Sequence, residues 1–305
     1  MKLSFYLLFI FYTLLFLFYP GDLEMYQLFA NNRDNILEIP LAQPKKIMPI
    51  PAVKPNSPQP LITGEGAYIV DLDTFTPIFE KNAHQTFFPA STTKIITALV
   101  TRDLYDPDEI VTVKEVQNTC QVMGLFPGEK ITVENLLYGT LVHSGNDGAY
   151  ALADHYGREK YLQLMNEKAK KLGMKDSVFK NPAGLDDYSQ VTTPYDLTLA
   201  ARELLRDKLL RKIVGTKEIT ISDVDYKAFH TLSNVNKLLG EIQGIGGLKT
   251  GYTEAAGENL VSFYKHEGHQ YIIVILKSAD RFSDTRNLVG WIDSNITYSE
   301  VPTLE

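Results

Sequence analysis

Residues 89–94 read Pro89-Ala90-Ser91-Thr92-Thr93-Lys94, and an apolar run, Ile95 to Val100, follows them. This run predicts a largely buried helix from Ser91 to about Leu104. Residues three positions apart share one face of a helix, so we expect the Ser91 hydroxyl and the Lys94 amine to lie side by side. A neutral amine can take the proton of a neighbouring hydroxyl and turn its oxygen into a nucleophile. The segment therefore predicts a serine–lysine catalytic pair.

The same serine–lysine spacing occurs twice more, at Ser177/Lys180 and at Ser262/Lys265. The first of these pairs leads into an Asn-Pro turn signal. The second lies in a predicted strand, where positions three apart point to opposite faces of the sheet. Only Ser91 and Lys94 are expected to meet on one helical surface.

Composition excludes several classes of protein. The chain has 305 residues and a formal net charge of −7, with no long basic run, so we expect one large domain and no nucleic-acid partner. Its single cysteine, Cys120, excludes an internal disulfide and a thiolate-built zinc site. A small packing role is expected for Cys120.

The N-terminal part of the chain divides into two segments before the predicted domain. Residues 1–24 contain an apolar stretch of about 17 residues, the lower limit for a membrane span, and no Ala-x-Ala cleavage site. We expect an uncleaved membrane anchor rather than a cleaved signal, and either one exports the chain. Residues 25–63 include seven prolines between positions 40 and 60 and predict an extended tether. The catalytic domain is expected at 64–305, outside the cytoplasm at the cell membrane, or secreted if the N-terminus is cleaved.

The pattern of the remaining chain predicts an α/β (α+β) fold, in which strands bracket a helical middle. A hairpin is expected around Asp73-Thr74, and a helix from Thr132 to about His143. Gly157 and Gly173 are expected to end successive helices, and Thr193-Pro194 to begin another. The later predictions are strands at 218–221, 247–250, 258–264 and 271–276, and a closing helix at 281–294.

Three short motifs follow one another along the chain: Ser91-x-x-Lys94, Ser144-x-Asn146 and Lys249-Thr250-Gly251. Together they resemble the motifs of penicillin-binding proteins and class A β-lactamases. The surrounding segments 128–139, 181–185, 192–197 and 246–253 resemble the D-alanyl-D-alanine carboxypeptidase family, the low-molecular-mass penicillin-binding proteins. The resemblance covers about residues 64–295. It implies a β-lactamase/transpeptidase-like fold, with an antiparallel sheet flanked by helices and a helical subdomain.

The resemblance also implies a reaction. Ser91 would attack the penultimate D-alanine of a peptidoglycan stem peptide, with Lys94 as base and Ser144 relaying a proton to the leaving amine. The substrate would be bound by Asn146, Lys249, Thr250, Gly251 and Tyr252, the last with Ser91 also offering a backbone N–H to the oxyanion. A second ammonium, Lys249, and partial burial are expected to lower the pKa of Lys94. Neither metal nor cofactor is expected, and β-lactams should inhibit by acylating Ser91.

The chain departs from the family pattern in two places. Gly148 follows Asp147 where the family commonly has alanine, a change expected to be mild. The family's C-terminal β-domain and amphipathic tail helix are expected to be missing, which fits an N-terminal anchor.

Several alternatives stay open at this point. A D,D-endopeptidase would use the same site on a cross-link, and a β-lactam sensor would acylate without turnover. A β-lactamase is disfavoured because we find no glutamate near Asn181 to activate water. We do not expect His143 to pair with Ser144 or His266 and His269 to bind metal, and Arg281 and Asp284 are expected to form a surface or packing pair.

Overall fold

The computed structural model describes residues 2–18, 48–117 and 120–299, and the chain divides into two units, Met1–Ile47 and Met48–Glu305. In the first unit, α1 (Lys2–Phe18) is an apolar helix whose side chains at positions 6–15 and 17 are exposed. Within the described residues, no helix is both long enough and apolar enough to span a membrane. Residues 19–24 of the predicted anchor and 25–47 of the predicted tether lie outside the described residues.

The second unit is built on a five-stranded antiparallel sheet in the order β3-β2-β10-β9-β8, so β8 is an edge strand. The predicted hairpin at Asp73-Thr74 is confirmed as the β2–β3 connection, and the expected antiparallel sheet is confirmed. The strands are β2 (Gly66–Asp71), β3 (Pro77–Lys81), β8 (Ile245–Thr253), β9 (Gly257–His266) and β10 (His269–Ser278).

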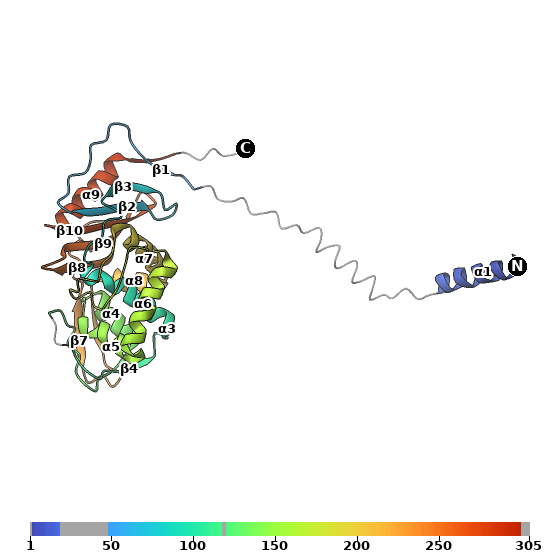
Figure 1. Ribbon diagram of the computed structural model, residues 1–305, viewed down its shortest axis with the longest axis horizontal. Coiled ribbons are helices and arrows are strands. Elements are labelled where there is room, and N and C mark those ends of the chain that lie inside the picture. The colour runs from blue at the N-terminus through green and yellow to red at the C-terminus, as the bar shows by residue number, and fades with distance from the viewer. Residues whose placement is uncertain (1, 19–47, 118–119, 300–305) are drawn as a thin grey trace. The chain divides into compact units, whose positions relative to one another are not determined.

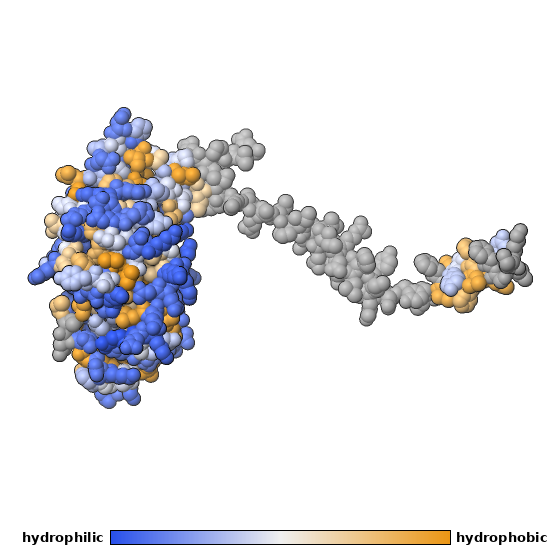
Figure 2. Space-filling view, viewed as in Figure 1, coloured by the Kyte–Doolittle hydropathy of each residue, from blue (hydrophilic) through white to orange (hydrophobic). Residues whose placement is uncertain are grey.

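Both faces of this sheet are apolar, and alternate residues supply two separate cores. Tyr68 and Val70 of β2 pack with the helical part of the unit, whereas Ile69 packs with α9 (Arg281–Asn295). This alternation follows from the two-residue repeat of a strand. Figure 1 shows α9 on one side of the sheet and the other helices of this second unit on the opposite side. The outer face seen in Figure 2 is mostly hydrophilic, with small apolar patches.

The helical part begins differently from our prediction. Ala90–Thr93 forms a 3-10 turn, η1, and the α-helix α3 begins only at Lys94. The predicted caps are confirmed: Thr132 accepts a hydrogen bond from Asn135 N, and Gly173 ends α6 in the left-handed conformation. The helices are α3 (Lys94–Leu104), α4 (Val133–Leu141), α5 (Asn146–Tyr156), α6 (Arg158–Leu172), α7 (Pro194–Arg206) and α8 (Lys208–Val214).

The strand predicted at 218–221 exists but does not join the main sheet. It pairs with the segment that follows it, in a two-stranded hairpin beside the helices. Sequence patterning identifies a strand but not its partner, since any extended strand can pair. The small sheets contain β4 (Ile110–Thr112) with β5 (Lys130–Thr132), and β6 (Glu218–Ser222) with β7 (Phe229–Ser233).

The boundary predicted at residue 64 is too late, because part of the proline-rich segment belongs to the domain. Strand β1 (Pro51–Val53) pairs with β11 (Ile296–Tyr298) near the other end of the chain. Further along, the Trp291 indole donates to the Pro58 carbonyl at 2.6 Å. Proline is tolerated on such a short edge strand, where its missing N–H breaks no interior ladder.

Candidate active site

Ser91 and Lys94 lie side by side, as the sequence predicts, although on a 3-10 turn that runs into α3 rather than inside one helix. Lys94 Nζ donates to Ser91 Oγ at 2.8 Å, and also to Asn146 Oδ1 and the Ala183 carbonyl, each at 2.7 Å. These contacts hold the amine against the hydroxyl. Lys94 is fully buried, while Ser91 is partly exposed.

Burial lowers the pKa of Lys94 from its ordinary value near 10.5 to about 7, although the negative charge of Asp147 opposes the shift. Desolvation of the ammonium is therefore the main cause of the lowered pKa, and the side chain is fully buried where partial burial was expected. At neutral pH a large fraction of Lys94 is uncharged. An uncharged amine 2.8 Å from a hydroxyl can accept its proton.

The second and third motifs meet across the site from this pair. Lys249 Nζ donates to Ser144 Oγ at 2.9 Å and to the Thr250 carbonyl at 3.0 Å. Burial, followed by the charges of Lys94 and Arg281, holds the pKa of Lys249 well below its usual range. Ser144 has a positive φ of 62° in the turn between α4 and α5. This conformation is uncommon for a side chain other than glycine and marks a constrained position.

The turn at Ser144 is held in place by the carboxylate of Asp147, three residues further along the chain. Asp147 accepts hydrogen bonds from the backbone N–H groups of Met123, Gly124 and Leu125, at 2.9 to 3.1 Å. The glycine at 148 fits this packing: a Cβ there would lie 2.9 Å from Thr140 Oγ1 and 3.2 Å from Met123 Sδ. The departure from the family's alanine therefore coincides with the space that the Met123 side chain occupies.

The edge strand β8 packs Gly251 directly against the backbone of Ser91. A Cβ on Gly251 would lie 3.0 Å from Ser91 N and 3.1 Å from the Pro89 carbonyl. The lack of a side chain lets the strand lie this close. The backbone of Ser91 therefore lies next to the backbone at the C-terminal end of β8.

We expect Gly251→Ala to lower the rate of acylation by penicillin about 10- to 100-fold, because the added methyl displaces the backbone of Ser91 from β8. The measurement is the second-order acylation rate with a fluorescent penicillin. The matched control is Gly290→Ala, where a Cβ meets no atom of the described residues within 4 Å. A Gly251→Ala protein that acylates at the wild-type rate would contradict the role of this contact.

A cleft of about 550 Å³ opens onto these groups. Of the residues predicted from sequence, Ser91, Ser144, Thr250, Gly251 and Tyr252 line the cleft, while Lys94, Asn146 and Lys249 are buried beside it through their hydrogen bonds. All eight are thus brought together. The expected packing role of Cys120 is wrong, since this residue is exposed and also lines the cleft.

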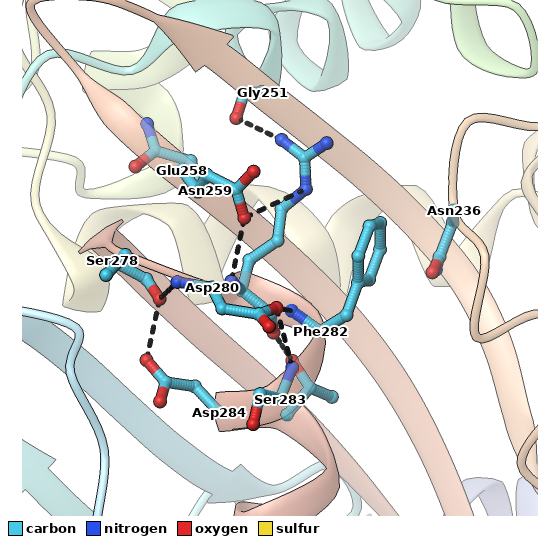
Figure 3. Close-up of polar contacts among 12 residues, drawn as sticks. Asn236, Gly251, Glu258, Asn259, Ser278, Asp280, Phe282, Ser283 and Asp284 are labelled. Carbon is cyan, nitrogen blue, oxygen red and sulfur yellow. Dashed lines mark hydrogen bonds and ion pairs between the residues drawn. The ribbon is translucent and has the colours of Figure 1, made fainter.

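Arg281 is the site residue that sequence reasoning missed. Instead of pairing with Asp284 at the surface, it is nearly buried and lines the cleft, where its Nη1 donates to the Gly251 carbonyl at 2.8 Å. Its Nε lies 4.0 Å from Glu258 Oε2. Figure 3 shows these contacts around Gly251 and Glu258.

Asp284 does not pair with Arg281 and instead accepts hydrogen bonds from Thr63, Gly64 and Ser278. The sequence at the start of α9 gave no signal of this, because only the packing of α9 on the sheet brings Arg281 to the Gly251 carbonyl of β8.

The loop opposite β8 is shaped by Asn181. Its side-chain oxygen accepts from the backbone N–H groups of Ala183, Gly184 and Leu185, so it serves as a structural cap of this loop. Gly184 has a φ of +85°, and a Cβ there would overlap the Ala90 carbonyl. The loop therefore presses against the turn that carries Ser91.

The chain is similar to known proteins of one family. The model of the D-alanyl-D-alanine carboxypeptidase family matches residues 53–280. The chain is 34% identical over 220 residues to the D-alanyl-D-alanine carboxypeptidase DacF of Bacillus subtilis, covering 69% of this chain and 56% of that protein. It is 32% identical over 269 residues to DacD of Escherichia coli, covering 81% and 68% respectively.

Solved structures show the same fold. The Streptomyces K15 DD-transpeptidase superposes with a TM-score of 0.74 at 31% identity, covering 78% of this chain and 99% of that one. A penicillin-binding protein homologue from Mycobacterium tuberculosis gives a TM-score of 0.75 at 27% identity, covering 80% and 96%. The expected β-lactamase/transpeptidase-like fold and the family resemblance are both confirmed.

Proposed function

Because the chain belongs to the D-alanyl-D-alanine carboxypeptidase family, we propose that it is a serine-type D,D-carboxypeptidase that removes the terminal D-alanine from peptidoglycan stem peptides. The observation that carries the proposal is the buried Lys94 amine, with a pKa of about 7, lying 2.8 Å from Ser91 Oγ at the edge of an open cleft. This is the activated nucleophile that acyl transfer needs.

The proposed acylation step proceeds as follows. Lys94 takes the proton of Ser91 as Oγ attacks the carbonyl of the penultimate D-alanine. The backbone N–H groups of Ser91 and Tyr252 stabilise the oxyanion, and one such donor contributes about 3 kcal/mol. Ser144, hydrogen-bonded to Lys249, passes a proton to the departing amine of D-alanine. Water then hydrolyses the acyl-enzyme, and a β-lactam would be trapped at the same stage.

Recognition of the substrate's free carboxylate is assigned to Thr250, Lys249 and Arg281. Burial holds the pKa of Lys249 well below its usual range in the free protein. Burial also lowers the pKa of Arg281, but a guanidinium starts from so high a value that it stays protonated, so Arg281 is the more persistent positive charge in the cleft. A carboxylate placed beside Lys249 would raise its pKa again and form the ion pair. Asn146, which bonds Lys94, would contribute its amide to the substrate's peptide groups.

We expect the purified protein to release D-alanine from diacetyl-Lys-D-Ala-D-Ala, measured by a coupled D-amino-acid oxidase assay. The peptide carries the free carboxylate that Arg281 and Lys249 would bind. Intact-mass analysis after penicillin exposure should show one adduct, mapping to the peptide that contains Ser91. An adduct elsewhere, or none, would overturn the assignment of the nucleophile.

The same assay separates the alternatives. Cleavage of cross-linked muropeptides without release of D-alanine would make the protein a D,D-endopeptidase, and a persistent penicillin adduct without turnover would make it a sensor. The K15 relative is named a transpeptidase, so an amine acceptor should be tested beside water. β-Lactamase activity is disfavoured, because the loop around Asn181 offers no water-activating glutamate, and the Asn181 side chain caps the loop instead.

We also propose that the catalytic unit works outside the cytoplasm, where stem peptides are found, and that the segment containing α1 exports it. Seven of its exposed side chains, between Tyr6 and Tyr12, are large and apolar. Cell fractionation with N-terminal sequencing distinguishes a retained anchor from a cleaved signal. A cytoplasmic protein with an intact N-terminus would contradict export.

A further inference from the structure

A second pocket lies next to the cleft and is not used by the chemistry above. It has a volume of about 240 Å³ and is lined in part by Phe88, Tyr188, Gln85 and the pair Glu65 and Lys277. The two aromatic rings meet edge to face, with centroids 6.3 Å apart. Tyr188 is 95% exposed, so its ring is available to a ligand.

The pocket continues the cleft, because the same two loops line both. On one loop, Leu185 and Asp186 face the cleft and Tyr188 faces the pocket. On the other, the β8–β9 turn, Glu254 faces the cleft and Ala255 faces the pocket. A ligand that leaves the cleft between these loops therefore enters the pocket.

The length of a stem peptide matches this path. Gly251 packs beside Ser91, and Ala255 follows it by four positions, which is at most about 14 Å of extended chain. A peptide can extend along the free edge of β8 by pairing with its backbone. When the penultimate alanine lies at Ser91, the three stem residues before it cover about 10 Å at ~3.3 Å per residue. The sugar that carries the stem then falls at the end of the β8–β9 turn.

The chemistry of the pocket favours an uncharged, amphipathic ligand. Lys277 Nζ lies 3.0 Å from Glu65 Oε1, so the two charges balance each other. Phe88 and Tyr188 offer apolar ring surface, while Gln85, Glu65 and Lys277 offer hydrogen-bonding groups. A sugar ring presents apolar C–H faces together with hydroxyl and acetamido groups. The neutral pair disfavours an occupant that depends on one strong charge.

We propose that this pocket is the subsite for the N-acetylmuramyl sugar at the start of the stem peptide. The proposal rests on the proposed carboxypeptidase function, since that function sets the direction and length of the bound peptide. The sugar packs on Tyr188 and Phe88 and hydrogen-bonds to the polar groups of the pocket. The protein then prefers stems attached to the glycan over free peptides.

Turnover and binding test this subsite separately. We expect kcat/KM for N-acetylmuramyl-pentapeptide to exceed that for the same pentapeptide without sugar about tenfold, with the difference in KM. Tyr188→Ala should remove this preference and leave kcat/KM for the sugar-free peptide within about twofold of the wild-type value. Phe88→Leu should reduce it in part. The control is Tyr226→Ala, a substitution of a tyrosine that is 75% exposed in the turn between β6 and β7.

A binding assay keeps the subsite testable even if turnover fails. Calorimetric titration should give N-acetylmuramyl-tripeptide an affinity about tenfold above that of the free tripeptide, a gain absent in Tyr188→Ala. Equal affinities, or equal kcat/KM with and without sugar, would overturn the subsite. If no peptide releases D-alanine while the sugar-dependent affinity persists, the proposed reaction is wrong and the subsite stands.

Discussion

Replacement of Ser91 by alanine is expected to lower D-alanine release at least about 10⁴-fold and to abolish covalent labelling by penicillin. The hydroxyl is the atom that would form the acyl bond, and no other group replaces it. Ser91 is partly exposed and its Oγ accepts one hydrogen bond from Lys94, so the loss should not unfold the protein. The measurements are turnover, labelling and the melting temperature of the same preparation.

A matched control lies elsewhere in the chain. Ser262→Ala removes the hydroxyl of another serine three residues before a lysine, but this one is buried within β9. Its activity and labelling should stay near wild type. Labelling that survives in Ser91→Ala and disappears in Ser262→Ala would refute the assignment of the nucleophile.

Replacement of Lys94 by alanine is expected to lower the acylation rate about 10³-fold, a typical contribution of a general base. The Ala183 carbonyl also loses the donor it has now, so a modest loss of stability should accompany the kinetic effect. Lys170→Ala, at an exposed site of α6, controls for the loss of one positive charge.

The pH dependence of wild type tests the same group without mutation. Only the neutral amine accepts a proton, and the pKa of Lys94 is about 7. The acylation rate should therefore rise with pH and level off above about 7, falling about tenfold for each pH unit well below it. The measurement is the rate of labelling by fluorescent penicillin from pH 5 to 9. A rate that continues to rise towards pH 10 would indicate an unshifted lysine and contradict the proposed base.

Local patterns predicted most of the elements that carry the site. The apolar run after Lys94 predicted a buried helix, and Thr132 and Gly173 predicted helix ends. Strands β8, β9 and β10 contain the strands predicted at 247–250, 258–264 and 271–276 and are longer at both ends. These features depend on interactions within a few residues, which is why sequence spacing reveals them. The three motifs owed their identification to the family resemblance, since each one alone is common.

Other features depended on distant parts of the chain. The pairing of β6 with β7 outside the main sheet and the pairing of β1 with β11 required knowledge of partners that periodicity does not contain. Arg281 was misjudged for the same reason: its place beside Gly251 results from α9 packing against the sheet.

The sequence by itself identified the candidate residues for acyl transfer and the local elements in which they lie. The tertiary structure decided their chemical state, because a lysine loses its proton near neutral pH only when the whole fold excludes water from it, as it does around Lys94. The tertiary structure also decided which groups surround the site. Loops and strands far apart in the chain line the cleft and the pocket at Tyr188, and they place Arg281 in the cleft.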